Sequence, residues 1–227
     1  MKFFSDDTSR RNECILLPVF EVKKEIPANM FEPRTVKLKD DKDVLIRAMK
    51  REDLEGSLAF FRALSEEDRL SLRGDFTARE SVEERIREME KGNVKRLVAV
   101  ADETIIADGA LELSHFGWER HIAELRLIVA TPYQHKGLGM LMAGALYNVA
   151  ASAGIEEIVV KMMATQPAAL RIFQKLGFRQ EVVLRDYVKD VKGTRKDLIL
   201  MRCPLHDLWQ KYEDFIHETD MRSFKME

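Results

Sequence analysis

Apolar and polar positions along the first third of the chain separate a hairpin from a helix. Alternating stretches at residues 34–39 and 43–49 flank the polar residues Asp40–Lys42, a pattern that predicts a β-hairpin. Apolar side chains recur at helical spacing through residues 51–64, which predicts a helix. A second short turn or helix is expected around residues 66–72.

The middle of the chain is expected to form one helix and then three strands. Ser81 precedes Glu84 at the spacing of a capping box, so we expect a helix to begin at Ser81 and to stop at Gly92. Polar turns then separate three apolar stretches, and each stretch predicts a strand. These stretches are residues 96–102, 104–113 and 121–130.

Glycine and proline delimit the elements of the last third. The small apolar residues after Gly137 predict a helix that ends at Gly154, a natural C-terminal glycine. Pro167 is placed to begin the next helix, which we expect to end at Gly177. A strand is predicted between these helices, at residues 155–162. After them we expect a hairpin of residues 178–188 and 196–203, and then an amphipathic helix at residues 204–227.

The order of these elements predicts a mixed α+β fold. Antiparallel strands come first and helices are inserted later, which differs from the regular alternation of a doubly wound parallel sheet. We expect one domain at residues 34–203, preceded by a proline-punctuated extension at residues 1–33 and followed by a helical tail at residues 204–227. The apolar face of this tail is suited to docking on the domain or to a homodimer contact.

Composition and charge exclude several classes of protein. The 227 residues carry 37 Lys and Arg against 39 Asp and Glu, without a basic run, so DNA and RNA are not expected partners. The first residues lack the pattern of a signal peptide, and the apolar run Cys14–Phe20 is too short to span a membrane. The two cysteines predict free thiols in a cytoplasmic protein. No cluster of His, Cys, Asp and Glu has metal-ligand spacing, so we expect no metal.

The segment TPYQHKGLGMLMAGAL, residues 131–146, places two glycines where a strand enters a helix. Backbone N–H groups at such a turn, together with the helix dipole, favour a bound anion. Lys136 adds a positive charge there, and His135 adds a donor. The segment lacks the GxxxxGK[ST] of a P-loop and the third glycine of GxGxxG, where Met142 stands. From the turn alone, a purely structural role for the glycines stays open beside a phosphate site.

Two motifs in the second half of the chain together resemble the GCN5-related N-acetyltransferase (GNAT) family. One is a [Q/R]xxGx[G/A] turn after a strand, and the other is an amide residue followed by an aromatic residue and Gly-Phe. The matching residues are Gln134, Gly137, Gly139, Gln166, Ala169, Phe173, Gly177 and Phe178. The resemblance covers residues 34–203 and implies the GNAT fold. That fold is a largely antiparallel sheet of about seven strands, splayed at the coenzyme site, with helices on both faces.

The resemblance implies acetyl-CoA as co-substrate. In the family the glycine turn binds the pyrophosphate of coenzyme A through backbone N–H groups, and the preceding strand pairs with the pantetheine arm. That strand is expected to splay from residues 155–162 and to open a slot for the acyl group. The coenzyme-binding residues implied in this way are Leu127, Ile128, Val129, Gln134, His135, Lys136, Gly137, Leu138, Gly139, Met140, Gln166 and Phe173.

Glu124 is the candidate general base that takes a proton from an acceptor amine. By strand alternation, Glu124 shares a face with Arg126 and Ile128. If this face lines the substrate cleft, partial burial is expected to raise the pKa of Glu124. An ion pair with Arg126 or with a neighbouring strand is the alternative. Glu112 on the preceding strand is a second candidate base, or a surface residue.

A finer resemblance is to the bacterial protein-lysine acetyltransferases of the family. Ala123-Glu124 and the spacing to Val129 and the glycine turn match that subgroup, whose glutamate is regarded as the base, and the stretch FFRALSEEDRL is similar to one of its helices. Two positions depart from the general family pattern. Phe173 stands where many members have a tyrosine acid, and Gln166 replaces an asparagine. Phe173 is then either a wall of the coenzyme channel or a core aromatic.

The leading hypothesis from the sequence is an acetyl-CoA-dependent N-acetyltransferase that acts on a primary amine of a protein or of a small molecule. A catalytically silent acyl-CoA-binding regulatory module is the alternative, because the usual acid position holds Phe173. The acceptor stays open among a protein lysine, a protein N-terminus, a polyamine, an antibiotic and an amino-acid-like metabolite.

Overall fold

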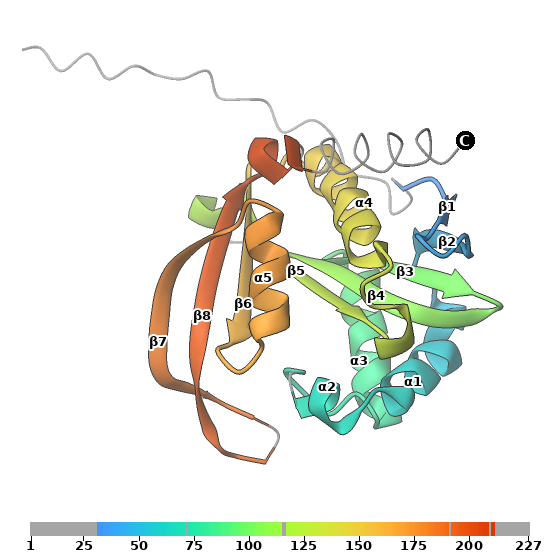
Figure 1. The fold of residues 1–227 in the computed structure, drawn as a ribbon, viewed down its shortest axis with the longest axis horizontal. Helices are drawn as coiled ribbons and strands as arrows, with labels where there is room; N and C mark the ends of the chain where they lie inside the picture. Colours follow the sequence, from blue (N-terminus) through green and yellow to red (C-terminus); the bar gives the residue numbers. More distant parts are fainter. Residues whose placement is uncertain (1–30, 71, 115–116, 191, 209, 212–227) are drawn as a thin grey trace, which may run out of the picture.

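The structure, a computed structural model, describes residues 31–70, 72–114, 117–190, 192–208 and 210–211. Its strands form one sheet in the order β1-β2-β3-β4-β5-β6-β8-β7 (Figure 1). Within the described residues, only β5 and β6 pair in parallel, and the other neighbours are antiparallel. The strands are β1 Arg34–Lys37, β2 Asp43–Ala48, β3 Val94–Ala101, β4 Thr104–Leu113, β5 Ile122–Val129, β6 Glu157–Met163, β7 Arg179–Lys189 and β8 Arg195–Pro204.

The predicted mixed α+β class is confirmed, with a larger sheet than expected. The sheet has eight strands rather than about seven, because both strands of the first predicted hairpin pair into it. The second predicted hairpin supplies β7 and β8, and β7 forms the far edge. Every strand expected from apolar patterning is therefore present.

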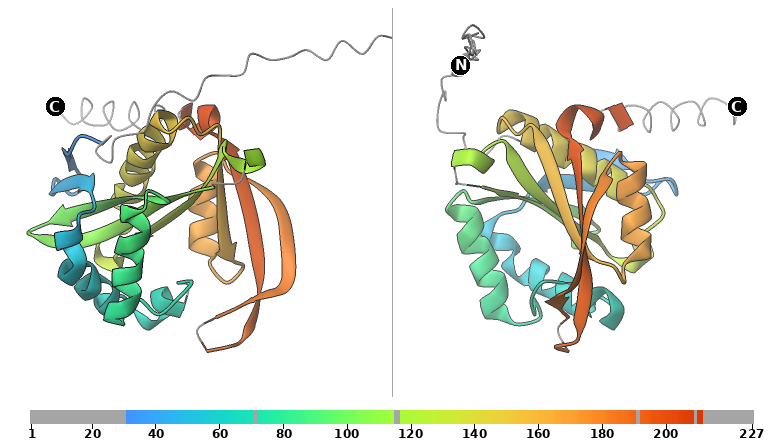
Figure 2. Two further views of the ribbon diagram at one scale, coloured as in Figure 1. Left: turned by 180° about the vertical axis from the view of Figure 1, so that it is seen from behind. Right: turned by 90° about the vertical axis from the view of Figure 1, so that its left-hand side faces the viewer.

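Helices cover both faces of the sheet, as the family resemblance implied (Figure 2). On one face, α1 and α3 enclose a core that contains Phe61, Val82 and Val98. On the other face, α4 and α5 lie over a larger core. The helices are α1 Leu54–Ala63, α2 Glu66–Leu70, α3 Arg79–Glu90, α4 Leu138–Ser152 and α5 Pro167–Lys175, with short 3-10 turns η1 Arg51–Asp53, η2 Gly117–Glu119 and η3 Thr131–Tyr133.

The start of α3 differs from the prediction. The helix begins at Arg79 after Ala78, which makes no side-chain cap, and Ser81 lies inside the helix. Asp75 explains the earlier start, because its carboxylate accepts hydrogen bonds from the backbone N–H of Thr77 at 2.9 Å and from its hydroxyl at 2.5 Å. This local turn fixes the chain direction just before the helix, so the capping-box prediction at Ser81 is wrong.

A glycine in β4 lets α4 lie close to the sheet. A Cβ atom on Gly109 would be 2.9 Å from Cδ1 of Leu146 and 3.1 Å from Cε of Met142, both on α4. Such distances are too short for a side chain without repacking of the helix. The N-terminal end of α4 follows β5 along the chain, after η3 and the glycine turn.

The first residues of the predicted tail continue from β8. Residues 205–208 and 210–211 are helical, and Leu205 and Leu208 are buried in the larger core. The rest of the predicted tail and most of the predicted N-terminal extension lie outside the described residues. No helix in the described part of the chain is long and apolar enough to cross a bilayer.

Candidate active site

The two parallel strands diverge in the middle of the sheet. β5 and β6 pair only over Ile122–Glu124, although β5 continues to Val129 and β6 to Met163. On its other side β5 stays paired with β4 as far as Val129. The β6-facing backbone edge of β5 is therefore open beyond Glu124, which confirms the predicted splay.

The glycine turn leaves a set of backbone N–H groups free at the start of α4. His135 has φ 61° and Gly137 has φ 88°, so both adopt the left-handed conformation. Among the described residues, none of the N–H groups of residues 135–139 donates to a carbonyl or a side chain. The N–H of Met140 is bonded to the carbonyl of Gly137 at 3.0 Å. The free donors and the positive end of the helix dipole make this turn an anion site.

Neighbouring loops hold the turn in place. The Gln134 side chain folds back and donates through Nε2 to the carbonyl of Val129 at 2.9 Å. The carbonyl of Lys136 accepts from the N–H of Lys39 at 3.1 Å, and Lys136 Nζ pairs with Asp40 at 2.7 Å. The hydrogen bond from Lys136 lowers the pKa of Asp40. Because Asp40 offsets the charge of Lys136, the backbone N–H groups are the main anion-binding feature of the turn.

The other predicted coenzyme-binding residues lie on β5, at the start of α4, and on or just before α5. Leu138 is fully buried, so only its backbone is available to a ligand. Gln166 precedes α5, and its Oε1 accepts from the N–H of Met163 at 3.0 Å, at the end of β6. The Phe173 ring packs edge-to-face on Phe178, with centroids 5.2 Å apart. Phe173 is partly buried against the larger core, and its role as a wall of the coenzyme channel stays a prediction.

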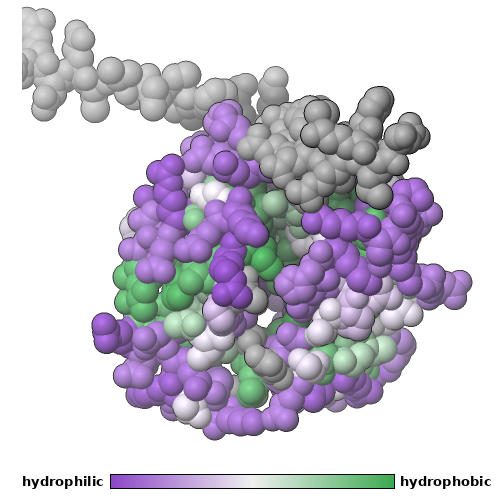
Figure 3. Space-filling view, viewed as in Figure 1, coloured by the Kyte–Doolittle hydropathy of each residue, from purple (hydrophilic) through white to green (hydrophobic). Residues whose placement is uncertain are grey.

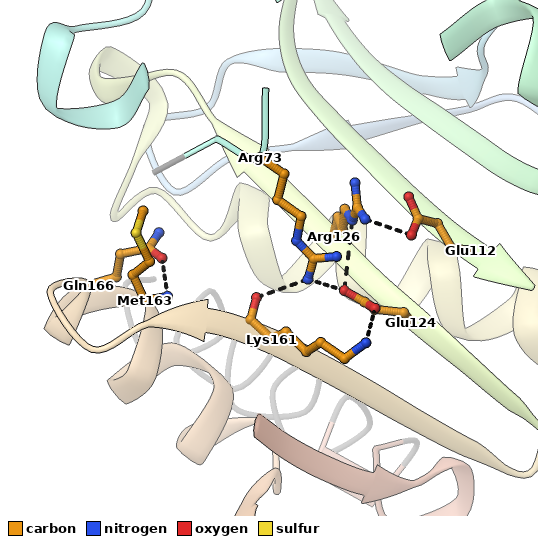
Figure 4. A network of polar contacts seen from close by, with 7 residues as sticks. All are labelled: Arg73, Glu112, Glu124, Arg126, Lys161, Met163 and Gln166. Carbon is orange, nitrogen blue, oxygen red and sulfur yellow. Dashed lines mark hydrogen bonds and ion pairs between the residues drawn. The ribbon is translucent and has the colours of Figure 1, made fainter. Parts of the chain in front are cut away.

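Glu124 lies where β5 and β6 separate, surrounded by cationic side chains (Figure 4). Lys161 Nζ on β6 donates to Glu124 Oε2 at 2.8 Å. Arg73, from the loop between α2 and α3, donates to Glu124 Oε1 and, at 3.4 Å, to the carbonyl of Lys161. Arg126 Nε lies 3.8 Å from Glu124 and its Nη2 bonds Glu112 at 2.7 Å. The carboxylate is thus held by cations from three parts of the chain.

The pKa of Glu124 is lowered, and the predicted increase is wrong. Burial of the carboxyl acts to raise the pKa, but the hydrogen bond from Lys161 and the charge of Arg73 outweigh it. The ion-pair alternative considered for Glu124 is therefore present in the structure. Glu112 lies directly opposite on β4, and Arg126 lies between the two carboxylates.

Arg73 and Lys161 were not found by sequence reasoning. Lys161 carried a weak signal, since it is the charged residue in an otherwise apolar end of the strand predicted beside that of Glu124. Arg73 carried none, because it lies 51 residues before Glu124 in a loop without a recognisable motif. Only the tertiary fold brings these three residues together.

A hollow of about 360 Å³ lies beside Arg73, on the side of α2. Its walls include Arg69, Leu72 and Phe76, and Lys192 comes from the turn between β7 and β8. Lys192 Nζ pairs with Glu66 of α2 at 2.6 Å and so joins the two walls. The space-filling view shows this face of the molecule hollowed between the α5 side and the α2 side (Figure 3).

Splayed parallel strands beside an anion-binding helix start define the class of fold that the sequence motifs implied. The Acetyltransferase (GNAT) domain family matches residues 43–179, and the chain belongs to this family. No three His, Cys, Asp or Glu side chains among the described residues are placed to share a metal ion.

Curated relatives match a shorter stretch. A [Ribosomal protein bS18]-alanine N-acetyltransferase from Escherichia coli (strain K12) is 28% identical over 79 residues, which are 35% of this chain and 53% of the relative. The matching protein from Salmonella typhimurium is 25% identical over 79 residues, which again are 35% of this chain and 53% of the relative. The chain thus spans about half the length of the curated relatives it matches.

Solved structures share the fold over most of the chain. A GNAT acetyltransferase from Streptococcus pneumoniae superposes with a TM-score of 0.61 at 23% identity, covering 71% of this chain and 99% of the other. Mycobacterium smegmatis RimJ in complex with CoA-disulfide gives a TM-score of 0.63 at 16% identity, covering 78% of this chain and 93% of the other. The GNAT domain of S. lividans PAT gives a TM-score of 0.64 at 16% identity, covering 76% of this chain and 96% of the other. At these identities the likeness shows the fold alone.

Proposed function

We propose that this chain transfers the acetyl group of acetyl-CoA to a primary amine. The observation that carries the proposal is the set of free N–H groups at residues 135–139, which follow the open edge of β5 that begins where β5 and β6 separate. Membership of the GNAT family supports the same conclusion. The open edge of β5 leads from this anion site to Glu124.

The residues present fit coenzyme A. The N–H groups of residues 135–139 would bind its pyrophosphate. The backbone edge at Leu127–Val129 would pair with the pantetheine arm, apart from the Val129 carbonyl, which already accepts from Gln134. Bound in this way, acetyl-CoA supplies a thioester whose carbonyl carbon accepts the nitrogen of an amine. Gln134 and the loop carrying Lys39 hold the turn in the shape that this binding needs.

Glu124 is the proposed base. A lysine-like amine has a pKa near ~10.4, so it must lose a proton before its nitrogen can attack. The nitrogen forms a bond to the acetyl carbon, the carbon–sulfur bond breaks, and sulfur leaves as a thiol once it is protonated. Of the two protons that the ammonium group loses, one passes toward Glu124 and on to solvent, and the other accounts for the thiol.

Replacing Gly137 with alanine is expected to weaken acetyl-CoA binding by about tenfold. Gly137 has φ 88°, and a side chain in the left-handed region costs ~1–2 kcal/mol, which favours a shifted turn with misdirected N–H groups. Titration with acetyl-CoA measures the effect. Gly92→Ala is the matched control, since Gly92 has φ 84° and open space around it, at the end of α3. Equal weakening in both variants would contradict the prediction.

The class of acceptor is a narrower proposal. The curated relatives are named for an alanine of a ribosomal protein, which supports a protein N-terminus as acceptor. The sequence similarity to protein-lysine acetyltransferases around Glu124 supports a lysine side chain. A small-molecule amine is the third candidate, and a homodimer through the tail stays a prediction.

A thiol-release assay with acetyl-CoA tests the proposed activity. The acceptors are a panel of polyamines, amino acids, lysine-containing peptides and peptides that begin with alanine, together with lysate proteins. We expect thiol release that depends on at least one acceptor, with the acetylated amine identified by mass spectrometry. Thiol release with no acceptor dependence would contradict acetyl transfer to an amine.

The second candidate is a catalytically silent acyl-CoA-binding module. Two observations favour it: Phe173 has no proton to give to a leaving thiol, and Glu124 is already ion-paired by Arg73 and Lys161. This candidate predicts acetyl-CoA binding in a titration without thiol release for any acceptor. An acetylated product in the panel above would exclude it.

A further inference from the structure

Positive charge exceeds negative charge around Glu124. Three cationic side chains, Arg73, Arg126 and Lys161, surround two carboxylates, Glu112 and Glu124. The adjoining hollow does not compensate, because its walls carry two cations and two carboxylates. These are Arg69, Lys192, Glu66 and Asp75.

The surplus continues beneath the site along the same face of the sheet. Asp108 on β4 bonds two guanidinium groups, Arg85 at 2.8 Å and Arg96 at 2.7 Å. An acceptor that approaches Glu124 therefore enters a field that repels further positive charge and attracts negative charge.

Arg73 stands where the ammonium group of an acceptor would have to go. Its guanidinium bridges Glu124 on β5 and the carbonyl of Lys161 on β6, across the point of separation (Figure 4). The Arg73 side chain is 38% exposed and comes from a loop, whereas Glu124 is 13% exposed on a strand. Of the two partners, Arg73 is the one that can move aside.

Moving Arg73 aside leaves its charge without a partner. Lys161 can stay bonded to Glu124, but the released guanidinium loses its charge-assisted hydrogen bond in a partly buried position. A carboxylate on the acceptor would restore that bond, and guanidinium and carboxylate match in geometry. A polyamine would add a second positive charge beside Arg73 and Lys161 instead.

We propose that the acceptor is a primary amine that carries a carboxylate a few atoms from its nitrogen, and that Arg73 exchanges Glu124 for this carboxylate. The inference rests on the proposed acetyl transfer and names its substrate class. Arg73 is then the residue that determines acceptor specificity. The carboxylate comes either from a free amino acid or from an acidic residue next to the amine of a peptide.

Matched pairs of acceptors test this directly. Lysine and cadaverine differ only by a carboxylate. Alaninamide carries a neutral amide in place of the carboxylate of alanine. Peptides that begin with alanine are compared with aspartate or asparagine at the second position. For each pair, thiol release gives kcat/KM, and calorimetric titration of the coenzyme-A-bound protein gives Kd.

The wild-type protein is expected to favour the acidic member of at least one pair by about tenfold in both measurements, the size of a charge-assisted hydrogen bond. Arg73→Gln is expected to remove this preference by weakening the acidic member, and Arg73→Lys to restore part of it. A preference among free amino acids or among peptides identifies the source of the carboxylate.

Arg185→Gln is the control for loss of a positive charge. Arg185 is exposed on β7, has no ion pair with the described residues, and should leave the preference unchanged. Equal use of both members of every pair, or a preference that survives Arg73→Gln, overturns the inference. Acid-selective binding without thiol release would support it while contradicting the proposed transfer. Turnover of the neutral or cationic members alone would support the proposed acetyl transfer and overturn the inference about the carboxylate.

Discussion

Glu124→Gln is expected to lower kcat/KM for acetyl transfer by about 100- to 10,000-fold, the usual contribution of a positioned general base. The amide of glutamine has the size of the carboxylate but cannot take a proton from the acceptor amine. Glu124 lies where β5 and β6 separate, at the end of the open edge that leads from the anion site. The measurement is thiol release at saturating acetyl-CoA across a range of acceptor concentrations.

Glu112→Gln is the matched control for this variant. Glu112 lies opposite Glu124 on β4 and bonds Arg126, but it has no ion pair with Arg73 or Lys161. Its turnover is expected to stay within a few-fold of the wild-type value. Both variants should bind acetyl-CoA normally, because the N–H groups of residues 135–139 lie elsewhere. Full turnover of Glu124→Gln with a true acceptor would remove Glu124 from the base role.

The pH dependence of turnover follows from the ion pairs of Glu124. Lys161 and Arg73 lower its pKa from the ordinary 4.5 against the opposing effect of burial, so the carboxylate is charged throughout the neutral range. We therefore expect kcat/KM to rise with pH as the acceptor amine, with a pKa near ~10.4 if it is lysine-like, loses its proton. A pH–rate profile that shows an inflection near neutrality with every acceptor, whatever the pKa of its amine, would contradict this assignment.

The fold was predictable where local patterning decides the structure. Apolar patterning located every strand of the described residues, and Gly137 marked the entrance to α4, where its φ of 88° excludes most side chains. The splay of β5 from β6 was predictable only through the family resemblance. No local pattern states how far two parallel strands stay paired.

The chemical environment of Glu124 was not predictable, because contacts between distant segments decide it. Strand alternation placed Glu124 and Arg126 on one face correctly. The pKa prediction considered burial alone, and burial does raise the pKa. Lys161 and Arg73 together reverse the sign of the pKa shift, and Arg73 does so from a loop 51 residues away. The predicted start of α3 is wrong for a local reason instead, since the turn at Asp75 precedes a helix that begins at Arg79 rather than at Ser81.

Asp108→Ala is expected to lower the free energy of unfolding by about 3–5 kcal/mol, the cost of removing one partner from a buried ion pair. Asp108 is 5% exposed, and its Oδ1 accepts from Arg85 at 2.8 Å and from Arg96 at 2.7 Å. Arg85 also lies between the rings of Phe61 and Phe76, at 4.6 and 4.3 Å from their centroids. Without Asp108, two guanidinium groups stay buried and unpaired. Urea unfolding near neutral pH measures the loss.

The contribution of Asp108 to the free energy of unfolding should disappear in acid. Burial acts to raise its pKa, but Arg96 and Arg85 outweigh it and hold the pKa below the ordinary 3.8. The stabilisation is therefore complete above that value and is lost as pH falls through the lower pKa of the folded state. Asp43→Ala, which removes an exposed pair with Lys37, should cost less than about 1 kcal/mol. Similar losses in both variants would contradict the role of Asp108 in a buried ion pair. Combining Asp108→Leu with Arg85→Met and Arg96→Met should recover most of the stability, because no unpaired charge remains.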